Sequence, residues 1–357
     1  MRQAGSTPPA ALTTVAAKVE ARLVDLFHRE LTRWEAVDRD LKEPLQSLQQ
    51  VVLAGGKRLR PAFCFWAFVG VGGDPTDDRV IDAGAALELL HISALVHDDV
   101  IDASRTRHGI EAAHVDFARH HTDAQWRGEA DRFGEGMAIL TGDLAAAYAD
   151  TLLSAPGHQA REVFDELRIE LNVGQLLDLI ASVQGDVTLE RARLIARYKS
   201  GKYTIERPLH LGAALAEPSR LEELTGPLTA YGLPLGEAFQ LRDDILGVFG
   251  DGTVTGKPVG EDLREGKPTM LYALAWERAR GPAARLLAQR FGRADLRSDE
   301  VETLQAVFQD TGALTEVEAA IDSLVEEALA AAANLPLNGE ARNALVDLAV
   351  FVAGRRY

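Results

Sequence analysis

Three aspartates within five residues, Asp98, Asp99 and Asp102, have the type and spacing most suggestive of chemistry in this sequence. The apolar segment before them predicts a helix. On that helix Asp98 and Asp102 project from one face, with about 6 Å between their Cβ atoms, while Asp99 points to the side. Like charges at this spacing repel, so the arrangement favours a bound cation. Oxygen ligands without a nearby cysteine are typical of Mg²⁺, which takes a few carboxylates together with water and substrate phosphates.

An apolar stripe continues from these aspartates toward the start of the same predicted helix. The stripe consists of residues spaced three or four positions apart, each before the last: Ala94, His91, Leu87 and Gly84. A solvated acidic helix end is the plainer explanation of the aspartates alone. A charged cluster at the end of a stripe with small residues instead indicates the mouth of a deep pocket. A lone histidine on such a face is as readily a core residue as a ligand-binding one.

A second pair of aspartates, Asp243 and Asp244, lies one helical turn after Gln240 in another apolar segment. One aspartate pair in a helix is weak evidence for a site. Two pairs, each in the C-terminal part of a long apolar helix, favour a shared site for several metal ions.

Basic residues gather at glycine breaks of the chain. Residues 55–61, GGKRLRP, place three cations beside a flexible turn, and the proline can begin the next helix. Backbone amides at a helix start together with Lys and Arg side chains form an anion site. The segment is not a Walker A loop, because that spacing and the preceding strand are missing. Further basic residues, each more readily a surface charge when taken singly, are Arg105, Arg107, Lys199, Lys202, Lys257 and Lys267.

The elements that must position these residues are helices. Apolar residues recur at three- and four-residue steps along nearly every long segment, and no βαβ rhythm occurs. Glycine and proline breaks divide the chain into roughly ten to twelve helical segments, with 116–136 as a polar connection. No shift in composition marks a boundary. The sequence therefore predicts one all-α domain over residues 1–357, with 1–15 flexible.

Composition and charge restrict the partners of the chain. Its 357 residues include 38 Lys and Arg and 54 Asp and Glu, for a net charge of −16. Such an acidic chain is a poor partner for nucleic acid or an anionic membrane. Charge alone also argues against a phosphate-rich substrate, unless bound metal supplies the positive charge.

Cysteine and hydropathy patterns bear on the compartment. The single Cys64 excludes an intramolecular disulfide framework and a cysteine-rich metal site, and its apolar surroundings predict a packed, inert thiol. No secretory signal is evident, and the longest apolar segment, 83–96, is too short to span a bilayer. We therefore expect a cytoplasmic protein without a transmembrane segment.

Six motifs in order resemble those of the trans-isoprenyl diphosphate synthases, the polyprenyl synthetase family. The motifs are GGKxxR at 55–60, DDVID at 98–102, GQxxD at 174–178, KSGKY at 199–203, FQxxDD at 239–244 and GK at 256–257 through Lys267. The likeness covers the chain from about residue 50 to about residue 270 and is strongest to the geranylgeranyl diphosphate synthases. It implies an all-α helical bundle of the isoprenoid synthase type with a central apolar cavity, and a homodimer.

The resemblance also implies head-to-tail prenyl transfer, in which isopentenyl diphosphate condenses with an allylic diphosphate in the presence of Mg²⁺. Matching positions would hold three Mg²⁺ ions with diphosphate bound, through Asp98, Asp102 and Asp243 with support from Asp99 and Asp244. Matching catalytic positions at the allylic diphosphate are Lys199, Gln240 and Lys257. Matching substrate-binding positions are Lys57, Arg60, His91, Arg107 and Lys267.

Three positions depart from the family pattern. Arg107 is followed by His108 where a second arginine is usual, which weakens the expected binding of isopentenyl diphosphate. Gly247 replaces a frequent third aspartate, and Ser200 replaces a threonine but keeps the hydroxyl.

Product length follows from the apolar stripe, because one isoprene unit is about as long as one helical turn, roughly 5 Å. Short-chain members of the family tend to carry bulky aromatics just before the first aspartate motif. Ser93 and Ala94 are small, so a C15 product is not blocked there, whereas Leu90 and Leu87 can form a floor deeper in the stripe. The prediction is a C20 product, geranylgeranyl diphosphate, or a somewhat longer chain.

Three alternatives remain open. A class I terpene cyclase shares the first aspartate motif but normally carries Asn-Asp-x-x-Ser-x-x-x-Glu, which is missing here. A non-catalytic subunit of a heteromeric prenyl synthase is kept open by His108 and Gly247. A helical metal phosphohydrolase, suggested by His97 and Asp98, would need an upstream histidine; His91 is too close and His28 lies in a different segment.

Overall fold

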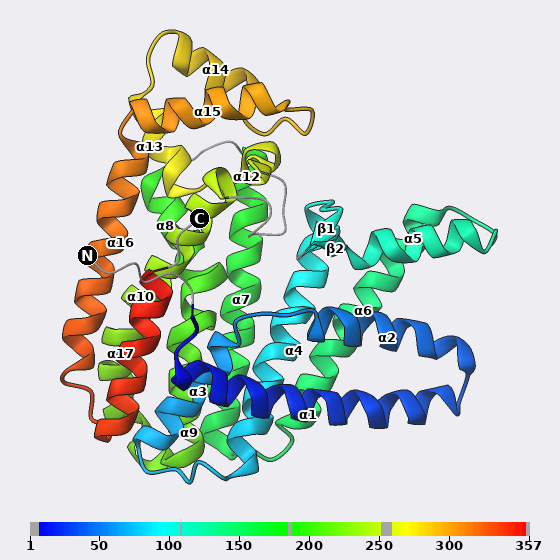
Figure 1. Ribbon diagram of the computed structural model, residues 1–357, viewed down its shortest axis with the longest axis vertical. Helices are drawn as coiled ribbons and strands as arrows, with labels where there is room; N and C mark the ends of the chain where they lie inside the picture. Colours follow the sequence, from blue (N-terminus) through cyan, green and yellow to red (C-terminus); the bar gives the residue numbers. More distant parts are fainter. Residues whose placement is uncertain (1–6, 108, 185–187, 251–258, 355–357) are drawn as a thin grey trace. The chain divides into compact units, whose positions relative to one another are not determined.

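The structure, a computed structural model, describes residues 7–107, 109–184, 188–250 and 259–354 (Figure 1). By its internal contacts the chain divides into two compact units, which we describe separately. Unit 1 comprises Met1–Ala11, Trp66–Asp74 and His158–Tyr357, and unit 2 comprises Leu12–Phe65 and Pro75–Gly157. A single domain over residues 1–357 stays a prediction, because two compact units can belong to one domain.

The prediction of an all-α fold is confirmed. In the described parts of the chain the only strands are β1 (Thr106–Arg107) and β2 (Ile110–Glu111), which pair antiparallel with Arg107 opposite Ile110. All the other elements are helices, most of them α-helices of several turns.

Unit 2 is built around helix α4. Its helices are α1 (Ala10–Glu35), the 3₁₀ turn η1 (Arg39–Leu41), α2 (Lys42–Leu53), α3 (Leu59–Gly70), α4 (Asp78–Ile101), α5 (Ala113–Asp123) and α6 (Ala130–Leu152). The first residues of α1 and the end of α3 belong to unit 1. Two sequence expectations differ from the structure: α1 begins within the stretch expected to be flexible, and α5 occupies part of the expected polar connection.

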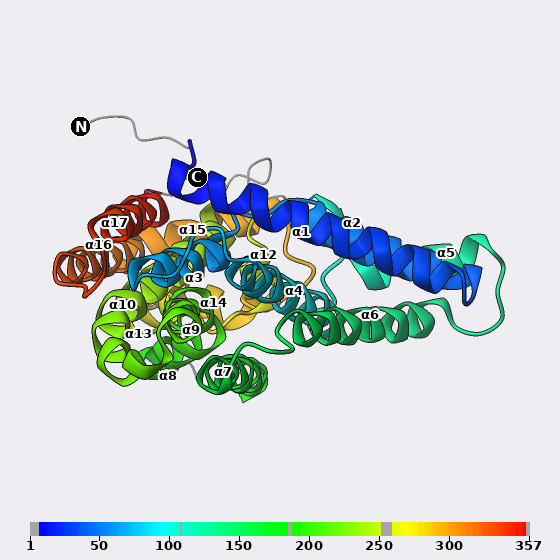
Figure 2. The same ribbon diagram turned by 90° about the horizontal axis from the view of Figure 1, so that it is seen from below.

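Helix α4 is buried on nearly all sides, because its residues from Ala83 to Leu90 are without exception buried. Its 24 residues are long and apolar enough to cross a membrane by length and composition, so the length argument made from 83–96 was too restrictive. However, 67% of its most apolar window is buried inside the protein, as expected for a core helix. Helix α6 lies alongside α4 (Figures 1 and 2). His97 Nε2 lies 3.0 Å from the Ile139 carbonyl oxygen of α6.

Unit 1 contains the remaining helices. They are α7 (His158–Gln184), α8 (Leu189–Ala196), the π-helix η2 (Arg197–Glu206), α9 (Arg207–Ala216), the 3₁₀ turn η3 (Pro218–Arg220), α10 (Leu221–Phe249), α12 (Glu261–Glu265), α13 (Met270–Arg278), α14 (Pro282–Arg290), α15 (Ser298–Asp310), α16 (Ala313–Ala332) and α17 (Gly339–Ala353). Helix α10 packs against α16, α17 and the π-helix, and α16 and α17 lie side by side in both views (Figures 1 and 2).

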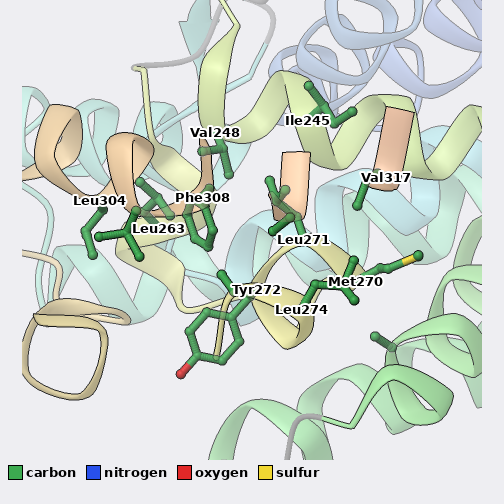
Figure 3. Packing of buried hydrophobic residues seen from close by; sticks show 14 of the residues in the cluster. Ile245, Val248, Leu263, Met270, Leu271, Tyr272, Leu274, Leu304, Phe308 and Val317 are labelled. Atoms are coloured by element: carbon green, nitrogen blue, oxygen red, sulfur yellow. The ribbon is translucent and has the colours of Figure 1, made fainter. Parts of the chain in front are cut away.

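A hydrophobic cluster fixes the C-terminal half of α10. Ile245 and Val248 pack with Leu271 of α13, Phe308 of α15 and Val317 of α16 (Figure 3). The aspartate pair of this helix directly precedes Ile245. The core of unit 1 therefore holds the helix segment that carries the second aspartate motif.

Candidate active site

The first aspartate cluster lies at the end of α4, where a guanidinium contacts two of its carboxylates. Asp99 is buried and accepts hydrogen bonds from Nε of Arg107, at 2.9 Å, and from its Nη2. The same Nη2 lies 3.6 Å from Oδ2 of Asp98. Asp102 follows as the C-terminal cap of the helix and is half-buried. The predicted cluster therefore forms within unit 2, with Arg107 as its internal cation.

A tight reversal after α4 brings Arg107 back to the aspartates. Ala103 has φ of 52°, in the left-handed region, and the amide of Ser104 donates to the Asp99 carbonyl oxygen at 2.9 Å. The two-residue strands β1 and β2 then pair, and the Ala112 amide donates to the Arg105 carbonyl oxygen at 2.9 Å. The hairpin thus sets the position of the guanidinium.

His114, in the first turn of α5, was not recognised from the sequence as part of this region. Burial lowers the pKa of His114, while the nearby Asp99 carboxylate opposes that shift. Its ring therefore favours the neutral form next to the aspartate cluster. Sequence spacing did not indicate His114, because the hairpin between α4 and α5 brings it near the aspartates.

The predicted anion site lies in the connection between α2 and α3. Lys57 is exposed, Arg60 is buried in the first turn of α3, and His91 is half-buried on α4. Between the two basic residues, Arg58 is buried and forms an ion pair with Glu88 of α4 at 2.6 Å. The sequence did not indicate this pair.

The apolar stripe on α4 has a closed end. Ala94 and His91 are half-buried, whereas Leu87 is 1% exposed. A Cβ added at Gly84 would lie 2.9 Å from Val19 Cγ2 and 3.1 Å from the Cβ of Pro61. Helices α1 and α3 therefore cover this face of α4 at Gly84.

The second aspartate motif lies in unit 1 on α10, where Gln240 donates to Oδ1 of Asp244 at 2.7 Å. Burial raises the pKa of Asp244 to about 8; the carboxylates of Asp262 and Asp243 add to this rise, and the bond from Gln240 opposes it. The predicted shared face of Gln240 and Asp244 is present. A buried carboxylate beside two others favours its neutral form, and the nearby Lys267 ammonium opposes this shift.

A carboxylate from outside the motif occupies the space at Gly247. A Cβ added there would lie 1.9 Å from Oδ2 of Asp262, on α12. Nζ of Lys267 lies 3.3 Å from Oδ1 of Asp262 and 2.6 Å from Glu265 Oε2. Lys267 is thus a cation among carboxylates, as Arg107 is in unit 2. Asp262 and Glu265 were not recognised from the sequence.

Lys199 belongs to the π-helix and forms an ion pair with Asp178 of α7, with 2.6 Å between Nζ and Oδ2. A Cβ added at Gly174 would lie 2.3 Å from the Lys199 amide nitrogen, so α7 and the π-helix are in backbone contact. π-Helical geometry is rare and often marks functional sites. The sequence indicated the motif but not the type of helix.

A buried polar network next to this π-helix was also missed. Glu170 of α7 accepts from Arg207 and lies 2.9 Å from Nζ of Lys202, while Glu206 accepts from the hydroxyl of Thr229 at 2.8 Å. Burial lowers the pKa of the adjoining His210 to about 4. These charges lie in apolar helices, where sequence alone does not show which of them are paired.

Some expectations lie outside the described residues or apart from the site. Lys257 and His108 fall outside the described ranges. Cys64 is buried, and burial raises the pKa of its thiol well above its usual range, which confirms the packed, inert thiol. The two aspartate motifs belong to different units.

The donor atoms fit Mg²⁺. Within the described residues no three His, Cys, Asp or Glu side chains converge to hold a metal by themselves. Mg²⁺ accepts this kind of partial protein shell, because it retains waters and takes substrate phosphate oxygens as ligands. In addition, Arg107 and Lys267 already lie as cations against the two carboxylate clusters.

Comparison with known proteins identifies the family of the chain. The family model described as polyprenyl synthetase matches residues 42–308. A geranylfarnesyl diphosphate synthase of Aeropyrum pernix is 32% identical over 288 residues, which cover 78% of this chain and 83% of that protein. A geranylgeranyl diphosphate synthase of Saccharolobus solfataricus is 31% identical over 264 residues, or 72% and 73% of the two chains.

A solved structure resembles most of the chain. It is that of geranylgeranyl pyrophosphate synthase from Corynebacterium glutamicum, complexed with isoprenyl diphosphate and magnesium. It is 35% identical with a TM-score of 0.87, and the match covers 95% of this chain and 99% of that one. Since the family model matches more than half of its length, this chain belongs to the polyprenyl synthetase family.

Proposed function

We propose that this protein catalyses the Mg²⁺-dependent condensation of isopentenyl diphosphate with an allylic diphosphate, giving an all-trans polyprenyl diphosphate of C20 or longer. The observation that carries the proposal is a basic side chain paired with carboxylates in each aspartate region. Arg107 pairs with Asp99, and Lys267 pairs with Asp262. Membership of a family of prenyltransferases supports it, and so do relatives named for C20 and longer products. Neither a terpene cyclase nor a non-catalytic subunit is favoured.

The carboxylates are assigned to metal binding. Asp98, Asp102 and Asp243 would hold the ions, three of them with diphosphate bound, and Asp99 and Asp244 would support these ligands. When bound, Mg²⁺ supplies positive charge that neutralises the leaving diphosphate.

The basic residues are assigned to the two diphosphates. Arg107, Lys199, Gln240 and Lys257 would bind the allylic diphosphate, assisted by Lys267. In the protein alone, Lys199 is paired with Asp178 and Arg107 with Asp99. A diphosphate would compete with Asp178 for Lys199 and with Asp99 for Arg107.

The second substrate is assigned to the connection between α2 and α3. Lys57, Arg60 and His91 would bind isopentenyl diphosphate there. Its double bond attacks the allylic carbon as the carbon–oxygen bond to the leaving diphosphate breaks. The proton lost from the adduct passes to the released diphosphate, so no side-chain base is required.

The apolar stripe of α4 is assigned to the growing chain. Its lining excludes water, which protects the allylic cation from capture. Ala94 is small and half-buried, while Leu87 is buried and Gly84 is covered by Val19 and Pro61 at the lower end. This arrangement supports a C20 product.

A homodimer is supported by an exposed apolar stripe on α7. Its members recur at alternating four- and three-residue steps, as in a helix–helix seam; they are Ile169, Val173, Leu176, Ile180 and Val183. Apolar patches of this kind mark interaction surfaces. We place the protein in the cytoplasm and expect no nucleic-acid partner, in keeping with its acidic charge.

The experiment is incubation of purified protein with Mg²⁺, isopentenyl diphosphate and each allylic diphosphate from C5 to C15, followed by analysis of product length. We expect elongation to C20 or beyond, and none when EDTA removes the metal. Absence of elongation with every primer would favour the non-catalytic subunit. Release of diphosphate and a hydrocarbon without isopentenyl diphosphate would favour the cyclase.

A further inference from the structure

Arg58 lies between Lys57 and Arg60, which we assigned to isopentenyl diphosphate, but its own side chain contacts protein groups. Its Nη1 donates to Oε2 of Glu88 at 2.6 Å, and its Nη2 donates to the Val52 carbonyl oxygen at 2.6 Å. The side chains of the ion pair are only 4% and 3% exposed. A guanidinium enclosed in this way is not accessible to a diphosphate, so Arg58 must act differently from its neighbours.

The backbone around Arg58 has an unusual conformation. Gly55 and Gly56 have φ of 125° and 130°, and Arg58 has φ of 49°, in a left-handed region that residues with a side chain rarely adopt. Leu59 then begins α3. A non-glycine residue stays in this region only where its surroundings constrain it. The two buried hydrogen bonds of the guanidinium supply that constraint.

The contacts of Arg58 connect three helices. Val52 lies in the last turn of α2, Glu88 in the middle of α4, and the carbonyl oxygen of Arg58 accepts from the Ala62 amide of α3 at 3.2 Å. A guanidinium at a helix C-terminus is also favoured by the helix dipole. The residue thus fixes how the chain leaves α2 and enters α3.

Charge compensation makes this contact difficult to replace. Glu88 is buried, and among the described residues its Oε1 has no hydrogen-bond partner. Without Arg58, an uncompensated carboxylate would remain in the interior, which is strongly unfavourable. Lysine is a poor substitute, because only a planar guanidinium presents two donors at this angle to separate acceptors.

We propose that the Arg58–Glu88 ion pair positions Lys57 and Arg60 to bind isopentenyl diphosphate. Both members of the pair are positioning residues, and the inference rests on the proposed function. Fixing the backbone at Arg58 fixes the separation of the cations on either side of it. Preorganised cations lose less conformational freedom when they bind an anion. Glu88 also precedes Asp98 on the same helix, so the pair connects the two substrate regions of unit 2.

The test compares the wild type with Glu88→Gln and with the double variant Arg58→Met/Glu88→Leu. Glu88→Gln removes one charge and keeps nearly the same side-chain shape. The second removes both, so that no uncompensated charge stays buried and the fold is retained. We expect the KM for isopentenyl diphosphate to rise about tenfold in both variants, with the KM for the allylic primer changed less than about twofold. The thermal midpoint of the double variant should stay near that of the wild type.

A matched control is Arg22→Met/Asp82→Leu. This ion pair also measures 2.6 Å and also ends on α4, but it joins that helix to α1 rather than to residues 55–60. In the control, the ratio of the KM for isopentenyl diphosphate to the KM for the allylic primer should equal that of the wild type. An unchanged KM for isopentenyl diphosphate in the Arg58 and Glu88 variants, or an equal rise of both KM values, would overturn the proposal.

Two further outcomes are distinguishable. If the double variant does not fold, Glu88→Gln alone tests the proposal, again by whether the KM for isopentenyl diphosphate rises more than the KM for the allylic primer. If the wild type elongates no primer, the proposed function fails while the positioning role stays testable by calorimetric titration with isopentenyl diphosphate. Weaker binding to Glu88→Gln than to wild type is then expected, and equal binding would overturn the role of the pair.

Discussion

Gly247 has no side chain, which leaves room for a carboxylate from another helix. Oδ2 of Asp262 lies 1.9 Å from the point where a Cβ would stand, and Asp262 is close enough to Asp244 to raise its pKa. From the sequence, Gly247 marked a lost aspartate and a weaker metal site. In the structure, a carboxylate lies at this position. The departure from the family pattern therefore does not remove negative charge from the second aspartate motif.

Gly247→Ala should reduce kcat/KM for the allylic diphosphate about tenfold at limiting Mg²⁺. The added methyl group must displace the Asp262 carboxylate, the mobile end of a side chain, so the fold should tolerate the change. Steady-state kinetics over a range of Mg²⁺ concentrations, together with a thermal unfolding midpoint, measure both effects.

The matched comparison is Asp262→Asn, alone and combined with Gly247→Ala. If both changes act on the same carboxylate, the double variant should be no worse than the more damaged single variant. If the losses in kcat/KM of the two single variants multiply in the double variant, Gly247 acts through some other contact.

At the scale of elements, the π-helix is pressed between two helices at glycine contacts. Gly174 of α7 meets the backbone of Lys199, and a Cβ at Gly236 of α10 would lie 2.4 Å from the Gly201 carbonyl oxygen. Such approaches place the Lys199 backbone within atomic contact of α7. The position of this cation therefore depends on the absence of a side chain at Gly174.

Gly174→Ala should destabilise the protein by about 1–3 kcal/mol, because a methyl group meets backbone rather than a mobile side chain. It should also raise the KM for the allylic diphosphate by displacing Lys199. Chemical denaturation and steady-state kinetics measure these effects. The control is Gly136→Ala on α6, where nothing lies within 4 Å of the added Cβ. Equal stability of the two variants would contradict the glycine contact.

The elements that the sequence predicted well are those set by local pattern. The apolar periodicity before Asp98 and Asp243 predicted long helices, and α4 and α10 carry these residues in their C-terminal parts. The π-helix could not be predicted, because its geometry depends on tertiary contacts with α7 and α10. Helix α5 was missed for a related reason: its segment is polar in composition, but Phe117 and His121 are buried, and the His121 ring packs against those of Trp126 and Phe133.

At the scale of the whole molecule, net charge misled about the ligand. A charge of −16 argued against phosphate-rich substrates, yet the chain belongs to the polyprenyl synthetase family. The relevant charge is local: carboxylates and a few cations lie together in each aspartate region. The motifs indicated which carboxylates and basic residues belong to each region, whereas net charge carries no information on where charges gather.

The exposed stripe on α7 carries the last prediction. Leu176 is 59% exposed at the centre of the stripe, and burial of such a side chain against a second copy contributes about 1.5–3 kcal/mol. Leu176→Glu should therefore shift the protein from dimer toward monomer, since a buried carboxylate without a partner is unfavourable. Sedimentation velocity across a concentration series measures the shift. Val350→Glu is the control, because Val350 is 52% exposed on α17, outside the stripe. A wild-type protein that is monomeric throughout the series, or a Leu176→Glu variant that stays as dimeric as the control, would contradict an interface at this stripe.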